Sequence, residues 1–353
     1  MRNKAKLRDI VNSSGDKKNN NTDYSAKPVS AKSAETVIAL VIPPDCAGIR
    51  LDQALARLLP DLSRNRLQAW IRGKRISVDE AEAIPRQKMW GGEKIQIKPP
   101  RDVIDTDYAP ENIPLDIIYE DESLIVINKP AGLVVHPGSG NWQGTMLNAL
   151  LHHAVQLNAI PRAGIVHRLD KDTSGLVAVA KTLEAQTSLV RQLQKHAVKR
   201  DYLALAQGCV AIDGWVDAPV GRHPVHRTKM AVAVGGKNAR THYRILETFD
   251  ECTLLQCSLE TGRTHQIRVH MHSIGHPLLG DPVYRGRPAK IIQHTMQQLG
   301  FSRQALHAQR LELTHPQRRK TIAWEAPLPQ DMTNLLSMLR AQRDKNARGR
   351  DQQ

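Results

Sequence analysis

One stretch organises this sequence: Gly164-Ile-Val-His-Arg-Leu-Asp-Lys-Asp-Thr-Ser-Gly-Leu176. Within it, the six positions from His167 to Asp172 hold one imidazole, two cations and two carboxylates. An apolar run at 176–180 follows directly and predicts a buried strand. Charged groups beside a buried strand are costly unless they are paired or take part in chemistry. We therefore predict that Asp170 is a reactive carboxylate.

The charge of the chain favours a polyanionic partner. Fifty Lys and Arg against 35 Asp and Glu give a formal net charge of +15 over 353 residues, and nucleic acid is the first candidate for so basic a chain. Residues 1–35 supply +4 and residues 340–353 supply +3, so about +8 remains on the rest. Because only 4% of residues are aromatic, we expect RNA to be bound through charge, shape and at most one stacked base.

Several other classes of protein are disfavoured. The four cysteines are Cys46, Cys209, Cys252 and Cys257, with no CxxC spacing. We therefore predict neither a zinc site nor a disulfide framework, and expect a reducing, cytoplasmic location. No apolar run approaches 18 residues, so we expect neither a membrane span nor a signal peptide. The sequence lacks a Gly-x-Ser-x-Gly elbow and a Walker loop, and Gly235-Gly236-Lys237 predicts a hairpin turn instead.

The chain is predicted to divide into five regions. Residues 1–35 are polar and predicted to be disordered, with a basic arm that contacts RNA phosphates as the alternative. Residues 36–99 form a small module, and residues 100–114 form a Pro-rich linker. The large domain covers 115–339, and a charged tail covers 340–353.

The small module is predicted to contain two helices followed by strands. Leucines at helical spacing predict a helix over 51–59, and Ser63 is a suitable N-cap for a second helix over 64–72. Strands are predicted at 75–78 and 94–97.

One face of the module is predicted to bind RNA. Between positions 49 and 75, seven Lys or Arg are opposed by only two Asp. Arg64, Gln68 and Arg72 repeat at i, i+4 and i+8, which places them on one helix face. Such a face can bind a phosphate backbone, and a merely solvated surface is the alternative. The predicted RNA contacts here are Arg50, Arg64, Arg66, Arg72 and Lys74.

The large domain interleaves strands and helices without a regular βαβ period. Its predicted strands cover 124–127, 132–135, 176–180, 199–205, 240–248 and 252–260, and its predicted helices cover 183–196 and a segment that Thr145 opens. This pattern predicts an α+β protein with a mixed, largely antiparallel sheet and flanking helices, preceded by the small α/β module.

Two further polar clusters lie in the large domain, at 200–202 and 261–268. In the second, Thr264 is predicted to cap a helix, with Arg268 one turn inside it and able to point into a cleft. The nearby histidines are His265, His270, His272 and His276. No carboxylate or thiolate lies among them, so we predict that they bind no metal.

At this point the sequence resembles a known family. The stretch 164–176 resembles the signature of the RluA family of pseudouridine synthases, and 262–268 resembles its third motif. Tyr202 falls where that family has its active-site tyrosine. Asn128-Lys129-Pro130 and His307-Ala308 also match. The resemblance covers nearly 300 residues and is strongest to the branch of large-subunit ribosomal RNA pseudouridine synthases termed D.

The small module resembles the S4 RNA-binding domain. The resemblance rests on Arg50-Leu51-Asp52, on Ser63-Arg64 and on the hairpin that follows. Val78-Asp79-Glu80 departs from it, because such domains usually carry Val-Asn-Gly in this turn.

The family resemblance implies roles for particular residues. Asp170 is implied to be the catalytic carboxylate, and Arg268 to form an ion pair with it. Tyr202 is implied to lie against the flipped uracil, and Arg168 to fill the stack that the base vacates. Lys129 and Arg263 are added as RNA-binding residues. His167 is expected to make a structural hydrogen bond.

The implied reaction converts specific uridines of 23S ribosomal RNA to pseudouridine. It breaks the N1–C1′ bond, turns the uracil and rejoins it through C5, so nothing is exchanged and no cofactor is required. A nearby arginine would keep the carboxylate ionised. We expect a monomer that acts on ribosomal RNA in pre-ribosomal particles. The alternatives are a non-catalytic RNA-binding or assembly factor, and a glycosylase or hydrolase that uses the same carboxylate.

Overall fold

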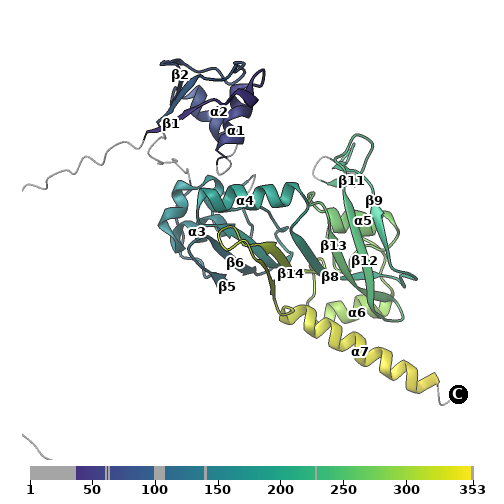
Figure 1. Cartoon of the computed structure of the whole chain (residues 1–353). Coiled ribbons are helices and arrows are strands. Elements are labelled where there is room, and N and C mark those ends of the chain that lie inside the picture. The colour runs from purple at the N-terminus through teal and green to yellow at the C-terminus, as the bar shows by residue number, and fades with distance from the viewer. Residues whose placement is uncertain are drawn as a thin grey trace, which may run out of the picture.

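The computed structural model describes residues 37–59, 62, 64–98, 108–138, 141–226 and 229–350, without the side chains at 65, 66, 349 and 350. The predictions made for residues 1–35 and for Ser63 therefore lie outside the described residues, as does the side chain of Arg66. The described part consists of a small N-terminal module and a larger body (Figure 1).

The module is a four-stranded antiparallel sheet with two helices. The order of strands is β1-β4-β2-β3. The strands are β1 (Ile38–Val41), β2 (Ile76–Val78), β3 (Ala81–Glu82) and β4 (Lys94–Ile97), and the helices are α1 (Leu51–Leu58) and α2 (Arg64–Arg72). Leu55 of α1, Leu67 of α2 and Ile95 of β4 are buried in one shared core. The predicted helices and the strands at 75–78 and 94–97 are thus confirmed.

The turn between β2 and β3 keeps its geometry although it lacks Asn-Gly. Asp79 and Glu80 have φ angles of +47° and +66°, the left-handed pair that a type I′ hairpin turn requires. Asp79 Oδ1 accepts a hydrogen bond from the backbone N–H of Lys94 at 2.8 Å. Asp tolerates this conformation better than most residues because its side chain can bond locally.

The large body is built on a nine-stranded sheet. Its order is β5-β6-β7-β14-β8-β13-β12-β9, with β15 paired to β14. The strands are β5 (Ile117–Glu120), β6 (Leu124–Lys129), β7 (Ser174–Ala180), β8 (Lys199–Gln207), β9 (Gly214–Asp217), β12 (Arg240–Thr248), β13 (Cys252–Leu259), β14 (Leu306–Thr314) and β15 (Thr321–Glu325). Among the described residues of this sheet, β7 and β14 pair in parallel and the other strand pairs are antiparallel. The predicted α+β class is confirmed.

Helices and a short ribbon complete the body. They are α3 (Met146–His153), α4 (Leu183–Gln194), α5 (Gln266–Ser273), α6 (Lys290–Gln298), α7 (Gln330–Arg350) and the two-stranded ribbon of β10 (Val220–Arg222) and β11 (Met230–Val232). Thr145 caps α3 as predicted, since its hydroxyl accepts the N–H of Asn148. The predicted turn at Gly235-Gly236 is present, with Gly235 at φ +82°.

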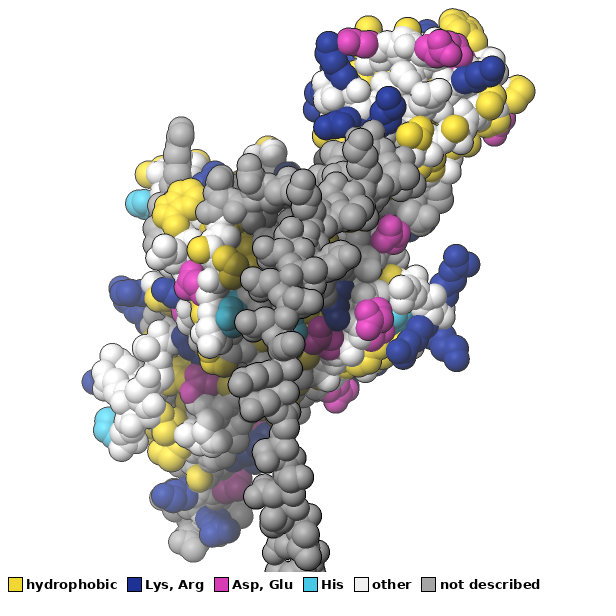
Figure 2. Space-filling view, turned by 90° about the vertical axis from the view of Figure 1, so that its left-hand side faces the viewer, with side chains coloured by type: hydrophobic (Ala, Val, Ile, Leu, Met, Phe, Trp, Pro, Cys, Tyr) yellow, Lys and Arg dark blue, Asp and Glu magenta, His cyan; other side chains and the backbone are white. Residues whose placement is uncertain are grey.

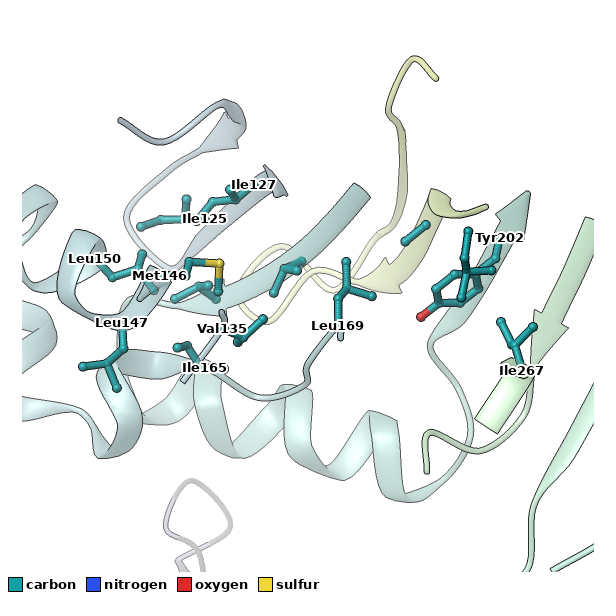
Figure 3. Close-up of a cluster of buried hydrophobic side chains, with 14 of the residues drawn as sticks. Ile125, Ile127, Val135, Met146, Leu147, Leu150, Ile165, Leu169, Tyr202 and Ile267 are labelled. Carbon is teal, nitrogen blue, oxygen red and sulfur yellow. The ribbon is translucent and has the colours of Figure 1, made fainter. Parts of the chain in front are cut away.

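Strand β7 separates two hydrophobic cores. Val177 and Val179 point into a core that also holds α3 residues and Met271 of α5, and Figure 3 shows part of this cluster. Leu176 and Ala178 point the other way, into a core shared with α4. Because successive side chains of a strand alternate between faces, a strand covered on both sides is apolar throughout.

Steric crowding requires glycine near both ends of the stretch 164–176. Gly164 has φ +76°, and a Cβ there would overlap the carbonyl oxygen of Ala180. Gly175 has φ +113°, and a Cβ there would overlap the backbone of Ala308 in β14. Both ends of the loop that carries Asp170 are therefore pressed against neighbouring backbone, which fixes where the loop can lie.

Two predicted boundaries are wrong. The linker predicted at 100–114 ends earlier, because Asn148 of α3 donates its amide N–H to the carbonyl of Ala109 at 2.8 Å and accepts the N–H of Glu111 at 3.0 Å. The tail predicted at 340–353 continues α7 as far as Arg350. Arg340 and Arg343 both pair with Glu247 of β12, so tertiary contacts hold a segment whose composition alone indicated solvation.

Two local predictions are also wrong. Residues 132–135 form no strand, and only Val134 makes an isolated bridge, to Thr145. Gly132 turns the chain there with φ +89°. Thr264 does not cap α5, because the N-cap is His265 in a left-handed conformation.

Candidate active site

Asp170 lies in the loop that leads into β7. The residue before it, Leu169, is buried in the core of Figure 3. The backbone carbonyl of Asp170 accepts the N–H of Thr173 at 3.1 Å. The side chain of Asp170 is 16% exposed. The backbone at Asp170 is therefore held in place by the buried Leu169 and by this hydrogen bond, while the carboxylate remains accessible to a substrate.

Arg268 of α5 contacts Asp170 directly. Its Nη1 donates to Asp170 Oδ2 at 2.9 Å, so the predicted ion pair is present. Its Nε and Nη2 donate to the two carboxylate oxygens of Asp281 at 2.7 and 2.9 Å. Burial acts to lower the pKa of Arg268, but hydrogen bonds and charges from Asp281 and Asp170 outweigh it and raise the pKa. Arg268 therefore stays a cation between two carboxylates.

Asp281 is the residue that the sequence analysis missed. It is buried, and its Oδ1 also accepts the backbone N–H groups of Val283 at 2.8 Å and Tyr284 at 3.0 Å. Burial acts to raise the pKa of Asp281, but the bonds and charge of Arg268 and these N–H groups lower it overall. Its only sequence signal was a polar residue in a Gly-Asp-Pro turn, which is ordinary for turns.

Tyr202 of β8 lies in the same buried cluster as Leu169 and Ile267. Figure 3 shows its hydroxyl on the side of Leu169. Burial raises the pKa of Tyr202; the charge of Arg200 opposes this and the charge of Asp170 adds to it. Tyr202 is therefore a neutral phenol close enough to Asp170 to sense its charge.

Two predicted RNA contacts of the large domain lie at the surface. Arg168, two residues before Asp170, is exposed. Arg263 is partly buried, and its Nε donates to the backbone carbonyl of Asn238 at 3.1 Å.

The prediction that Lys129 binds RNA is wrong. Lys129 is fully buried, and its Nζ donates to the carbonyl oxygens of Pro130, Leu133 and Lys171 at 2.8, 2.9 and 2.9 Å. Burial lowers the pKa of Lys129 to about 7, against the charges of Asp172 and Asp170. Three carbonyls occupy all three donors of an ammonium group, so Lys129 ties β6 to the loop of Asp170.

His167 makes the structural hydrogen bond that was expected. Its Nε2 accepts the backbone N–H of Ala178 in β7 at 2.9 Å. Burial, with a contribution from the charge of Arg200, lowers the pKa of His167 to about 3. The ring is therefore a neutral acceptor that pins the loop to the strand.

The histidines near α5 have separate partners. His270 contacts Thr241 and the carbonyl of Ala218, each at 2.9 Å. His276 contacts the carbonyl of Gln207 at 2.8 Å. Within the described ranges, no group of three or more His, Cys, Asp or Glu is placed to hold a metal ion.

The basic face of the module is held by a buried carboxylate. Asp52 accepts bonds from Arg50 at 2.9 and 3.1 Å and from Arg64 at 2.9 and 3.1 Å. It also accepts a bond from Gln68, which in turn accepts one from Arg72 at 3.2 Å. Burial acts to raise the pKa of Asp52, but the bonds from Gln68, Arg64 and Arg50 lower it overall. The predicted face therefore exists as one network.

The arginines of this network remain partly open to solvent. The side chains of Arg50 and Arg64 are 35% and 43% exposed. Lys74 is more exposed and pairs with Glu82 at 2.7 Å. Figure 2 shows several Lys and Arg side chains at the surface of the module.

The sequence of this chain is similar to those of known pseudouridine synthases. The family described as RNA pseudouridylate synthase matches residues 123–273. The chain is 59% identical over 322 residues to the ribosomal large subunit pseudouridine synthase D of Nitrosomonas europaea, covering 90% of this chain and 93% of that relative. It is 52% identical over 328 residues to the protein of the same name from Neisseria meningitidis serogroup A, covering 91% and 87%.

The fold of this chain is also similar to that of a solved pseudouridylate synthase structure. The human RNA pseudouridylate synthase domain containing 4 superposes with a TM-score of 0.50 at 27% identity, covering 64% of this chain and 92% of that one. Among the described residues, no helix is long and apolar enough to cross a membrane. The chain belongs to the RluA family of RNA pseudouridine synthases, enzymes that isomerise uridine in RNA to pseudouridine.

Proposed function

We propose that this enzyme isomerises specific uridines of large-subunit (23S) ribosomal RNA, with Asp170 as its catalytic carboxylate. The observation that carries the proposal is the contact of Arg268 with Asp170 at 2.9 Å, while the side chain of Asp170 stays 16% exposed. The substrate class is supported by the names of the relatives from Nitrosomonas and Neisseria. We infer further that the enzyme acts as a monomer in the cytoplasm, on assembling ribosomal particles.

The site is suited to chemistry by a single ionised carboxylate. The reaction breaks the N1–C1′ bond of uridine and forms a C5–C1′ bond, while the proton on C5 is lost and N1 gains one. Asp170 acts either as a nucleophile or as a base at the sugar, and both routes require the charged form. Arg268 provides for this, because an adjacent cation favours the carboxylate over the acid.

The uridine must leave its stack before Asp170 can reach it. Flipping costs a few kcal/mol and costs least for a base already in a loop. We assign the stacking surface for the flipped uracil to Tyr202, and base–aromatic stacking contributes about 1–3 kcal/mol. Arg168 is exposed two residues from Asp170, which suits it to fill the vacated position. A structured, single-stranded loop of RNA is therefore the expected substrate.

We assign RNA binding to the network around Asp52. Arg50 and Arg64 donate to Asp52 through Nε and Nη2, and their side chains stay 35% and 43% exposed. Guanidinium groups held in this way are suited to binding phosphates. Arg66 belongs to this proposal by its place in α2, and Arg263 by its place within the third motif.

The direct test is pseudouridine mapping of unmodified large-subunit ribosomal RNA after incubation with the purified protein. A few discrete uridines should be converted. RNA that is bound without conversion would support the assembly-factor alternative, and release of free uracil would support a glycosylase. Either result would overturn the proposal.

A further inference from the structure

His265 has no role in the site as described so far, and its backbone is unusual. It has φ +57° and ψ +21°, immediately before α5. Residues other than glycine seldom adopt this conformation, and Asn or Gly would adopt it at lower cost. A strained conformation of this kind is commonly kept where a side chain must point in a particular direction.

The side chain of His265 reaches from Tyr284 toward Asp170. Its Nδ1 lies 2.9 Å from the hydroxyl oxygen of Tyr284. Its Nε2 lies 3.9 Å from Asp170 Oδ1. The two rings meet edge to face, with centroids 5.6 Å apart and an interplanar angle of 82°. The imidazole thus stands between the phenol and the carboxylate oxygen that Arg268 leaves free.

The groups on either side of the His265 ring favour one of its tautomers. The hydroxyl oxygen of Tyr284 accepts the backbone N–H of Met230 at 2.9 Å. Its own proton is then available for Nδ1 of His265. Burial lowers the pKa of His265 despite the charge of Asp170, so the neutral ring carries one proton. We place that proton on Nε2, because this nitrogen faces Asp170 Oδ1 and a carboxylate oxygen can only accept.

Tyr284 also connects His265 to Asp281, the carboxylate that holds Arg268 in place. Its backbone N–H donates to Asp281 at 3.0 Å. The guanidinium carbon of Arg268 lies 5.1 Å from the centroid of its ring. Tyr284 therefore contacts both side chains that lie next to the carboxylate of Asp170: Arg268, which bonds to Oδ2, and His265, which faces Oδ1.

We propose that His265 is a positioning residue for Asp170: held by Tyr284, it donates its Nε2–H to Asp170 Oδ1 once RNA is bound. The separation of 3.9 Å is longer than a hydrogen bond, and hydrogen bonds in active sites often tighten only in the substrate complex. With both oxygens held, the carboxylate cannot rotate away from the sugar. This inference rests on the proposed catalytic role of Asp170.

The test uses His265→Gly in the full-length protein. Glycine fits the left-handed backbone, so the variant should fold. At saturating RNA, the single-turnover rate should fall by about 10- to 100-fold, the range for loss of one hydrogen bond to a charged group. The Kd for RNA should stay within about twofold. Free imidazole should restore part of the rate, because it can occupy the vacated space and donate the same proton.

A matched control is His272→Asn. The ring of His272 also meets Tyr284 edge to face, with centroids 6.0 Å apart, but it makes no ion pair with Asp170 among the described contacts. Its rate should be unchanged. Tyr284→Phe should lower the rate less than His265→Gly, because the imidazole remains but loses its fixed tautomer.

Three outcomes would overturn the inference: a wild-type rate in His265→Gly, a loss confined to RNA affinity, or a loss that imidazole does not restore. Failure of the proposed function is a separate result. If Asp170→Asn retained activity, the catalytic assignment itself would fall. If Asp170→Asn were inactive while His265→Gly kept the full rate, only the positioning role would fall.

Discussion

The module and the large body each contain a buried arginine–aspartate network, and the two differ in which charge is in excess. In the module, Asp52 alone serves Arg50 and Arg64. In the body, Arg268 pairs with both Asp170 and Asp281. The first network leaves cationic groups at the surface, whereas the second leaves a carboxylate there. The same pair of residue types thus supports the phosphate-binding face that we propose in one place and the reactive carboxylate that we propose in the other.

In both networks the residue that is shared between two partners is buried, and at least one of its partners is partly exposed. The shared residue is enclosed in both networks, with Asp52 and Asp281 fully buried as side chains and Arg268 only 4% exposed. Asp170, Arg50 and Arg64, which are proposed to contact RNA, are the more exposed members of these networks. An enclosed partner fixes direction, because it has no water with which to exchange its hydrogen bonds. The exposed partner then meets the ligand in a preset geometry.

The largest effect is expected from Asp170→Asn, which removes the exposed carboxylate and keeps its shape. Pseudouridine formation should fall by at least about 1,000-fold, because no other group supplies the missing base or nucleophile. Affinity for RNA should change little. Single-turnover assays and filter binding on the same RNA measure the two effects. Substantial residual activity would show that the excess carboxylate is not the reactive group.

Asp281→Asn is expected to have the next largest effect. It should lower the free energy of unfolding by about 3 kcal/mol, because removing one charge of a buried pair leaves the other uncompensated. The rate should fall too, as Arg268 loses its fixed direction. Urea unfolding and single-turnover assays measure these changes.

Asp331→Asn is the control for this variant. Arg303 holds Asp331 in the same two-bond geometry, but that carboxylate is 42% exposed. Its loss should cost no more than about 1 kcal/mol. Equal losses in the two variants would contradict the distinction by burial.

Arg64→Ala tests the cationic network and should have a smaller effect. The Kd for RNA should rise by about three- to tenfold at physiological salt, and the salt dependence should flatten by about one counterion. The rate at saturating RNA should be unchanged. Arg240→Ala is the control, since Arg240 lies on β12 and pairs with Asp217 and Glu260. Equal weakening by both would mean that net charge, rather than this face, binds RNA.

The smallest effect concerns acid stability. The pKa of Asp52 and of Asp281 is lowered in the folded state. Each charge therefore stabilises the fold above the unfolded pKa of about 4, and this contribution is lost as the pH falls toward the lower folded pKa. Unfolding by urea at pH 5 and pH 3 should show a smaller difference in Asp281→Asn than in wild type. An unchanged difference would mean that Asp281 adds little to acid sensitivity.

Local patterns predicted much of the fold. The leucine spacing of α1, the cap at Thr145 and the apolar run of β7 each depend on neighbours within a few residues, and the structure agrees with them. Prediction was wrong where composition and burial disagree. Lys129 is predicted to bind RNA, and lysine is mostly an exposed residue, yet it lies buried at the end of β6 with all three donors bound to carbonyl oxygens. Residues 340–350 were read as a tail because they are charged, yet α7 continues through them.

The sequence by itself determined the loop of Asp170. Its two glycines, the imidazole of His167 and the following strand lie close together in the sequence, although the requirement for glycine at Gly175 comes from the neighbouring backbone of Ala308 in β14. Only the tertiary structure decided which groups surround the carboxylate. Arg268 is 98 positions away from Asp170, and Asp281 is joined to Arg268 only because a turn folds back on α5. Contacts of this kind depend on sheet order and burial, and neither the spacing nor the type of a residue encodes them.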